Sequence, residues 1–157
     1  MEKENTKAGI RLDESFAEQL LGNDAVGMIL EEGEAFRSLM TYYRCAIMEV
    51  ETKFNVLDKE FSLTYDRNPI QTIKSRLKSP ESIIEKLQRK GLPFSADVIE
   101  RELHDIAGVR VVCAFSDDIY LLSEYLLSQD DITLLKKKDY IENPKENGYR
   151  SLHLIVQ

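Results

Sequence analysis

The side chains best suited to chemistry are concentrated near the end of the sequence. Residues 142–157 read ENPKENGYRSLHLIVQ, a polar, turn-rich loop that changes into the alternating pattern of a β-strand. On a strand, one face would carry Tyr149, Ser151 and His153. An aromatic ring, a hydroxyl and an imidazole in one row suit a ligand that has a flat ring and phosphate groups. The same alternation is also the ordinary sign of a half-buried edge strand whose polar side meets water.

Lysines surround this loop and favour the first interpretation. They are Lys136, Lys137, Lys138 and Lys145. Clustered cations at the mouth of a polar face attract an anionic ligand. The competing interpretation is a helical interaction protein whose basic loop simply faces solvent.

A second candidate is the start of a short helix. Ser79 suits the N-cap, Pro80 the first helical position and Gly91 the end of the helix. Backbone N–H groups at such a start bind phosphate well. Ser82, Lys86 and Lys90 would lie one turn apart on one face of this helix, and Lys78 comes just before the cap. Two lysines and a hydroxyl could thus converge with the helix start on one anion. A solvated basic helix face is the alternative that this charge pattern leaves open.

The third candidate is an arginine in an otherwise apolar strand, HDIAGVRVVCAF, at residues 104–115. Gly108 and Arg110 share one face of that strand, and the glycine leaves room for a flat group against the backbone. A charge in such a strand needs a partner. Asp105, just before the strand, either forms an ion pair with Arg110 or leaves the arginine to a ligand.

The elements that must position these residues follow from the hydrophobic periodicity. The clearest is a helix from residue 33 to about residue 63, whose apolar residues recur every three or four positions. Further helices are expected at residues 13–21, 80–90, 95–103 and 117–128, after a loose tail over residues 1–12. Strands are expected at residues 106–115, 132–135 and 150–156, with the lysines in a loop after the second strand. This order predicts an α+β (α/β-like) fold in which a mixed β-sheet is flanked by helices.

The bulk composition is that of a soluble globular protein of one domain. Its net charge of −7 is uneven, because residues 1–66 hold 14 acidic and 7 basic side chains and residues 67–157 hold 14 of each. Local basic patches suit small anionic ligands better than long nucleic acid. We expect no membrane partner, since no apolar run approaches the roughly 20 residues that span a bilayer. Cys45 and Cys113 are expected to be reduced core residues of a cytoplasmic protein.

Three blocks of the sequence carry a resemblance to a known family. They are KSRLKSPESIIEK at residues 74–86, HDIAGVRVV at residues 104–112 and KDYIENPKENGYRSLHLIV at residues 138–156. In this order and spacing, the chain resembles the RelA/SpoT-type synthetases of guanosine tetra- and pentaphosphate, and among them the small alarmone synthetases. The resemblance covers about half of the chain.

The resemblance implies a GTP pyrophosphokinase of the stringent response. Such an enzyme transfers pyrophosphate from ATP to the ribose 3′-hydroxyl of GDP or GTP, with Mg²⁺. It also implies a nucleotidyltransferase-like synthetase fold, with a helical N-terminal segment over residues 1–66 and a synthetase core over residues 67–157. The small synthetases are typically cytoplasmic homotetramers, so we expect a homo-oligomer.

The family's functional residues transfer by motif onto this sequence. The resemblance implies that Arg76 and Arg110 sandwich the adenine of ATP, and that Lys78, Ser82 and Lys86 hold its phosphates. Asp105 is implied as the catalytic carboxylate that binds Mg²⁺. On the guanine-nucleotide side, the implied contacts are Lys138, Lys145, Tyr149 and His153, with Lys136 and Asn147 as weaker candidates. Tyr149 would stack on the guanine.

The sequence departs from the family pattern at its last residue. The family continues into a segment of the form Glu-x-Gln-x-Arg-Thr, whose glutamate is the second metal ligand and base, and this sequence ends at Gln157. Either the chain is a fragment of an active enzyme, or it is a truncated, catalytically inactive nucleotide-binding or regulatory module. For the 157 residues alone, the expectation is weak ATP binding and little or no synthesis.

Overall fold

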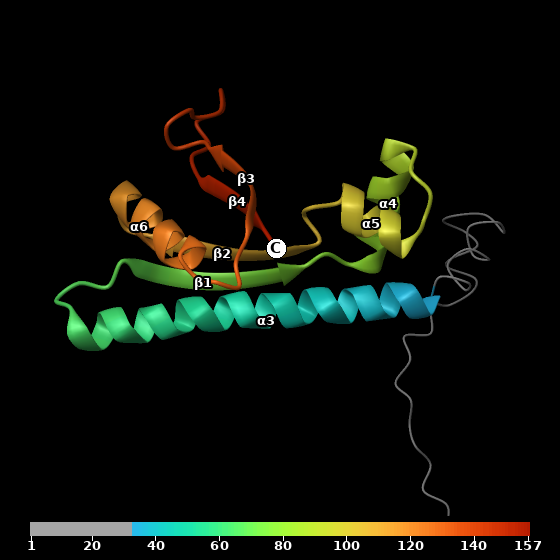
Figure 1. Ribbon diagram of the computed structural model, residues 1–157. Coiled ribbons are helices and arrows are strands. Elements are labelled where there is room, and N and C mark those ends of the chain that lie inside the picture. Colours follow the sequence, from blue (N-terminus) through green and yellow to red (C-terminus); the bar gives the residue numbers. More distant parts are fainter. Residues whose placement is uncertain (1–32) are drawn as a thin grey trace, which may run out of the picture. The chain divides into compact units, whose positions relative to one another are not determined.

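The computed structural model describes residues 33–157 and combines helices with antiparallel strands (Figure 1). This arrangement confirms the expected fold class. The described chain forms two compact units, the first with residues 33–40 and 80–103 and the second with residues 41–79 and 104–157. The expected tail over residues 1–12 and the expected helix over residues 13–21 lie outside the described residues.

The helix α3, residues Gly33–Thr64, confirms the helix expected from the apolar periodicity and supplies residues to both units. Its buried side chains, Ile47, Phe54 and Phe61, follow one another at intervals of seven residues, which places them on one face of the helix. The opposite face is exposed, so α3 packs through a single stripe.

Two short helices dominate the first unit. α4, residues Pro80–Lys90, begins at the proline and is followed by Gly91 with a φ of 67°, as the capping pattern predicted. α5, residues Ala96–Glu102, follows Ser95, whose side chain makes no capping hydrogen bond. The unit is stabilised instead by fully buried side chains of both helices and the residue after them: Ile83, Leu87, Ile99 and Leu103.

The second unit contains a strand that the sequence analysis missed. β1, residues Ile70–Leu77, pairs antiparallel with β2, residues Ala107–Cys113. The register shifts between Ile70 and Thr72, which is the mark of a β-bulge. Because of that shift the inward residues Ile70 and Ile73 are an odd number of positions apart, and strict alternation, the usual signal of a strand, is lost.

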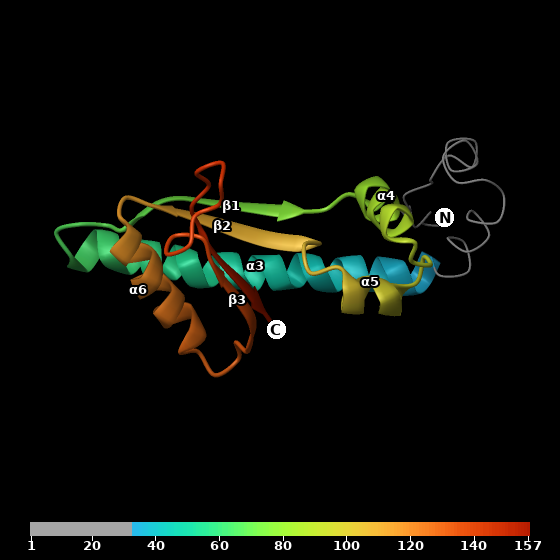
Figure 2. The same cartoon turned by 90° about the horizontal axis from the view of Figure 1, so that it is seen from above.

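The core of the second unit lies between the β1–β2 pair and two helices. Figure 1 and Figure 2 show the two strands running along α3. Phe54 and Phe61 of α3 pack with Ile70 of β1 and with Leu122 and Leu126 of α6, residues Ser116–Leu127. The inward residues of the two strands, Ile73, Val109, Val111 and Cys113, are partly buried against this cluster. This packing fixes which face of the sheet is left for solvent.

The last two strands also pair antiparallel and correct two expectations. β3, residues Leu134–Asp139, includes Lys136 to Lys138, which the sequence analysis placed in a loop. β4, residues Leu152–Val156, begins after Tyr149 and Ser151, which were expected within the strand. In the described residues the four strands form two antiparallel pairs, where a single mixed sheet was expected. The lysine run was misassigned because a solvent-exposed strand need not show the alternation of apolar and polar residues by which strands are predicted.

The two cysteines differ from each other. Cys45 is exposed on α3, so its assignment to the core was wrong. Cys113 on β2 is partly buried, and that burial raises the pKa of its thiol to about 11. Both are free thiols.

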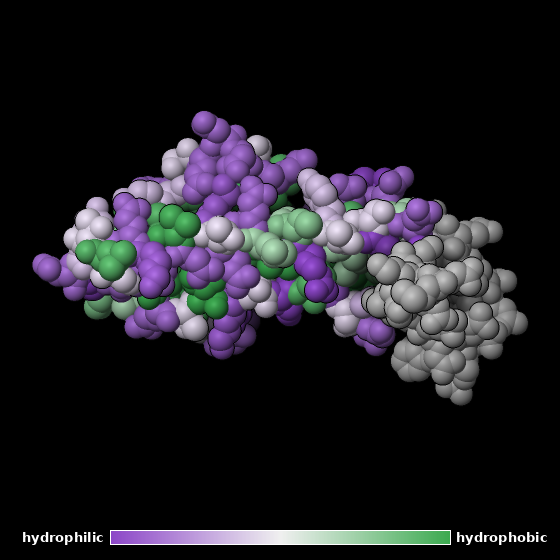
Figure 3. Space-filling view, turned by 90° about the horizontal axis from the view of Figure 1, so that it is seen from below, coloured by the Kyte–Doolittle hydropathy of each residue, from purple (hydrophilic) through white to green (hydrophobic). Residues whose placement is uncertain are grey.

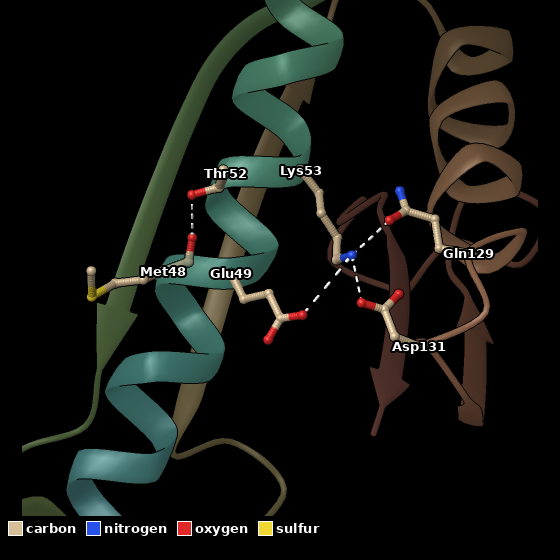
Figure 4. A network of polar contacts seen from close by, with 6 residues as sticks. All are labelled: Met48, Glu49, Thr52, Lys53, Gln129 and Asp131. Atoms are coloured by element: carbon tan, nitrogen blue, oxygen red, sulfur yellow. Dashed lines mark hydrogen bonds and ion pairs between the residues drawn. The ribbon is translucent and has the colours of Figure 1, made fainter.

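A half-buried lysine joins α3 to the loop between α6 and β3 (Figure 4). The ammonium group of Lys53 lies 2.7 Å from Oε1 of Gln129 and 2.8 Å from Oδ2 of Asp131. Its contact with Glu49, one turn away on α3, is 4.0 Å long. Beyond this loop, the backbones of Thr133 and Gln157 exchange two hydrogen bonds of 2.7 and 2.8 Å. Lys53 therefore anchors the loop two residues before this pairing begins.

A bidentate ion pair holds the start of α6. Arg67, in the connection from α3 to β1, donates hydrogen bonds of 2.6 and 2.7 Å to the two carboxylate oxygens of Asp118. The Asp118 side chain is only 3% exposed. The guanidinium group, which also lies 5.1 Å from the centre of the Phe115 ring, lowers the pKa of the Asp118 carboxyl.

We expect Asp118→Asn to lower stability at neutral pH and to flatten its dependence on pH. Because the folded-state pKa of Asp118 is depressed, its contribution to stability is present above the unfolded-state pKa and is lost as the pH falls through the folded-state pKa. Urea-unfolding midpoints between neutral pH and about pH 3 measure the change. The matched control is Asp117→Asn in the same helical turn. Equal flattening in both variants would contradict this role of the ion pair.

Candidate functional site

The outward face of the β1–β2 pair gathers positive charge. The register places Lys74 opposite Arg110 and Arg76 opposite Gly108. Lys74, Arg76 and Arg110 are exposed and form no ion pair with any residue that the structure describes. Like charges directly opposite each other destabilise an antiparallel pair. The arrangement does not stabilise the sheet, and its positive charge would attract an anion or an electron-rich ring.

Gly108 leaves an open floor between the two arginines. A methyl group built at Gly108 would meet no atom within 4 Å. Arg110 is the diagonal neighbour of Arg76 across the ladder, and such neighbours lie about 7–8 Å apart. That spacing accommodates one planar ring with a guanidinium group on either side. Stacking on flat rings is a property of arginine that lysine lacks.

Lys78 and Asp105 lie side by side where β1 ends. The ammonium group of Lys78 is 2.9 Å from Oδ2 of Asp105, and the Lys78 side chain is only 17% exposed. The backbone N–H of Lys78 donates to the carbonyl oxygen of Ile106 over 2.7 Å, which extends the pairing of the two strands by one step. Asp105 thus pairs with Lys78, and the expected alternative of an ion pair with Arg110 was wrong.

Two further sequence candidates, Ser82 and Lys86, lie one turn apart on α4, in the first unit. Their part in a phosphate site shared with Lys78 stays a prediction. Lys90, on the same helix, donates a 3.4 Å hydrogen bond to the carbonyl oxygen of Glu102 at the end of α5. Lys90 therefore links the two helices.

A tight loop brings Lys145 and Tyr149 together. The N–H of Lys145 donates to the carbonyl oxygen of Tyr149 over 3.2 Å, and the N–H of Gly148 donates to that of Lys145 over 2.8 Å. Gly148 has a φ of 78°, a conformation that side chains disfavour. Oδ1 of Asn147 accepts the N–H of Tyr149 over 3.1 Å. Asn147, a weaker ligand candidate, is thus a residue that shapes the loop.

Beside this loop, three aromatic rings and one cation form a cluster. The Tyr149 hydroxyl is 3.0 Å from Nε2 of His153. The Tyr140 ring meets the His153 ring edge-on at 5.3 Å, and the Tyr149 ring lies 6.3 Å from that of Tyr140. The ammonium group of Lys145 lies 4.7 Å from the centre of Tyr140 and 5.2 Å from that of Tyr149. Tyr140 was not predicted from the sequence, because alternation on β4 could not reveal a ring from the turn after β3.

The strand register adds lysine to the same region. Lys138 of β3 is the direct partner of His153 on β4, so the two share a face of the pair. Lys136 pairs with Ile155 directly after a shift in register that follows Leu134, and it lies two residues before Lys138 on the same strand. Lys137 points elsewhere, with its ammonium group 5.7 Å from the centre of the Tyr120 ring. Of the predicted polar row, Ser151 is the exception, since its hydroxyl oxygen is buried.

Partial burial lowers the pKa of His153, and the positive charges of Lys145, Lys138 and Arg110 lower it further. The imidazole is therefore neutral at neutral pH and can share a hydrogen bond with the Tyr149 hydroxyl. Arg110, the smallest of these influences, lies on β2, whereas Lys138 and Lys145 lie on β3 and in the loop before β4.

Carboxylates are scarce among these cations. Between residues 33 and 157, no three His, Cys, Asp or Glu side chains are grouped so that they could hold a metal ion. Asp105 supplies the oxygen donor that Mg²⁺ prefers, and Mg²⁺ usually takes one or two carboxylates together with substrate phosphates.

No described helix is both long and apolar enough to cross a membrane.

Comparisons with known proteins agree with these features. The family described as "Region found in RelA / SpoT proteins" matches residues 75–157. GTP pyrophosphokinase YwaC of Bacillus subtilis is 44% identical over 124 residues, which cover 79% of this chain and 59% of YwaC. GTP pyrophosphokinase YjbM of the same organism is 40% identical over 114 residues, which cover 73% of this chain and 53% of YjbM.

Solved structures give the same result. The small alarmone synthetase 1 from Bacillus subtilis bound to its product pppGpp superposes with a TM-score of 0.69 at 36% identity, over 78% of this chain and 62% of that chain. A GTP pyrophosphokinase family protein from Streptococcus pneumoniae superposes with a TM-score of 0.70 at 32% identity, over 78% of this chain and 59% of that one. The chain thus spans between 53% and 62% of the length of these relatives.

We expect Lys145→Gln to raise the pKa of His153 towards its ordinary value, because it removes a positive charge that opposes protonation of the imidazole. An NMR titration of the imidazole resonances measures the change, and His104→Gln identifies which resonance belongs to His153. Lys59→Gln, on the exposed side of α3, is the matched control. A His153 pKa that is equal in the wild type and in Lys145→Gln would contradict the electrostatic arrangement described above.

Proposed function

This chain belongs to the RelA/SpoT family, and from that membership we propose that it is the nucleotide-binding part of a GTP pyrophosphokinase that makes guanosine tetra- or pentaphosphate. The observation that carries the proposal lies in the second unit. There the open floor at Gly108 between Arg76 and Arg110, the Lys78–Asp105 pair and the Tyr149–His153 pair occur together. These features suit two nucleotides, with ATP beside Gly108 and the guanine nucleotide beside Tyr149.

On the ATP side, we assign the flat adenine to the space over Gly108. Arg76 and Arg110 would stack on its two faces, since guanidinium groups pair with planar rings. Lys78 would neutralise phosphate charge next to Asp105. The family resemblance adds Ser82 and Lys86 on α4 as further phosphate contacts.

On the guanine side, Tyr149 would stack on the base while Lys138, Lys145 and His153 line the rest of the nucleotide. Lys136 is a weaker contact in this assignment. A neutral His153 can accept or donate a hydrogen bond without adding to the local positive charge. Asn147 would contribute chiefly through the shape of the loop that presents Tyr149.

In the proposed reaction, the 3′-oxygen of GDP or GTP attacks the β-phosphorus of ATP. The bond from that phosphorus to the oxygen bridging it to the α-phosphate breaks, so AMP leaves and the hydroxyl proton is released. Mg²⁺, when bound, would neutralise charge on the transferred pyrophosphate, and Asp105 is the described residue that would hold it. The protein's own contribution is positioning and fixed positive charge, which are the main sources of rate in transfers of this kind.

We further propose that the protein works in the cytoplasm as a homo-oligomer, a tetramer by family resemblance. α3 has exposed apolar side chains that could contribute to such contacts: Tyr42, Met48, Val56 and Leu63. Seen from below, patches of hydrophobic surface interrupt the polar surface of the molecule (Figure 3). The division into a helical segment over residues 1–66 and a synthetase core over residues 67–157 belongs to the same proposal.

The first test is synthesis itself. With the family's Glu-x-Gln-x-Arg-Thr segment in place after Gln157, the protein should convert ATP and GDP into guanosine tetraphosphate and AMP, which thin-layer separation of labelled products detects. Asp105→Asn should slow this by about 10²- to 10³-fold, because it removes a charge that holds the metal. Glu51→Gln, an acid of α3 that bonds Ser75, is the control. Synthesis unaffected by Asp105→Asn would refute the assignment of Asp105.

The second test separates the two nucleotides by calorimetry. Gly108→Val should weaken ATP binding and spare GDP, because the added side chain fills the floor without meeting a protein atom at its Cβ position. Arg76→Ala should act in the same direction. Tyr149→Ala should weaken GDP binding by about 1–3 kcal/mol, the usual value of a base–aromatic stack, and spare ATP. Equal losses for both nucleotides in all three variants would overturn the two-sided assignment.

A further inference from the structure

A tyrosine outside the three sequence blocks reaches the guanine side of the site. Tyr120 lies on α6, and its hydroxyl donates a 2.9 Å hydrogen bond to Oδ2 of Asp139, the last residue of β3. The bond to the carboxylate raises the pKa of Tyr120. The pKa of Asp139 is lowered, first by the N–H of Glu142 and also by Tyr120. Neither residue has a role in the function proposed above.

Asp139 uses its other oxygen to shape the turn that follows β3. Its Oδ1 accepts the N–H of Ile141 over 3.0 Å and that of Glu142 over 3.1 Å. Tyr140 lies inside this turn, and its own N–H donates to the carbonyl oxygen of Ser151 over 2.9 Å. The backbone of Tyr140 is thus held by the carboxylate before it and by the segment leading into β4.

The Tyr140 ring in turn touches two of the residues assigned to the guanine nucleotide. It lies 5.3 Å from the His153 ring, at an interplanar angle of 85°. The Lys145 ammonium group lies 4.7 Å from its centre, which is closer than its 5.2 Å to Tyr149. Edge-to-face ring pairs and cation–π contacts of this geometry are both favourable. An uninterrupted series of contacts therefore runs from α6 to the cation and the imidazole.

We propose that Tyr120, Asp139 and Tyr140 are positioning residues that hold Lys145 and His153 in the arrangement that receives the guanine nucleotide. The identity of the ligand rests on the function proposed above, whereas the placement of Lys145 and His153 rests on the contacts alone. Tyr120 acts through the carboxylate of Asp139, and Tyr140 acts through its ring. None of the three needs to touch the nucleotide.

Two variants test the two ends of this series. Tyr120→Phe removes one hydroxyl and leaves the ring in place. Its matched control is Tyr125→Phe on the same helix, because the Tyr125 hydroxyl has no hydrogen bond to a described residue and its ring contacts Phe61. Tyr140→Leu removes the ring, and Tyr140→Phe restores it without the hydroxyl. All four variants are compared with the wild-type chain.

The first readout is the dissociation constant for GDP against that for ATP, measured by calorimetry. Tyr140→Leu should raise the GDP constant about fivefold, the equivalent of one cation–π contact at a partly exposed site, and leave the ATP constant unchanged. Tyr120→Phe should raise it about twofold, which corresponds to the low end of the value of one hydrogen bond, because it loosens the turn. Tyr140→Phe and Tyr125→Phe should match the wild type. A loss for ATP equal to that for GDP would overturn the proposal.

The second readout needs no nucleotide. An NMR titration of His153 should show a higher pKa in Tyr140→Leu and a smaller rise in Tyr120→Phe, because the imidazole loses cover and Lys145 loses its place beside it. Variants that lower the melting temperature yet leave this pKa and the GDP constant unchanged would overturn positioning in favour of a purely structural role. If the wild type binds neither nucleotide, the function proposed above fails, and the titration alone decides whether the series positions Lys145 and His153.

Discussion

The register of β1 against β2 is the constraint on which the rest of the site depends. A shift of one residue would turn every side chain of β1 to the other face. Arg76 would then face the core, and Ile73 would face solvent. The packing of Ile73, Val109 and Val111 against α3 and α6 prevents this, since the buried area would be lost in the shifted register. The hydrophobic core thus determines where the arginines stand.

The bulge between Ile70 and Thr72 lets both ends of β1 satisfy that core. Ile70 is buried before the bulge, and Ile73 and Leu77 face inward after it, so the strand enters and leaves the core on the same side. The same displacement made the strand hard to predict, because its apolar residues follow intervals of three and four that resemble a helical pattern.

The helices were predictable because α3, α4 and α6 have clear periodicity, a proline start or a glycine end. Of the site, the outward cations and Tyr149 could be predicted from motif and alternation. The Lys78–Asp105 pair and the place of Tyr140 could not, because they depend on contacts between segments far apart in the sequence.

The cations of the proposed site repel one another, and the structure limits this electrostatic repulsion in two ways. Neutral groups separate the charges, with Gly108 beside Arg110 and an uncharged His153 among Lys138, Lys145 and Arg110. Aromatic faces also take up charge, since Lys145 lies over two tyrosine rings and Lys137 over a third. The ion pairs that stabilise the second unit, Arg67–Asp118 and Lys53–Asp131, involve other residues. Apart from the Lys78–Asp105 pair, which belongs to the proposed site, stability and ligand binding therefore draw on separate sets of charges.

This separation explains how repulsive contacts such as Lys74 opposite Arg110 persist in a folded protein. Their repulsion is small in water and is screened by salt, because the face is exposed. Binding of a polyanion would replace that repulsion by attraction, and whatever binds the folded state alone also stabilises it. A face that is slightly unfavourable when empty thus gains more from a phosphate ligand than a neutral face would. The favourable binding energy comes from the charges of Lys74, Arg76 and Arg110, which the core holds in register. Within the described part of the chain these side chains form no ion pair, so their charge is left for a ligand.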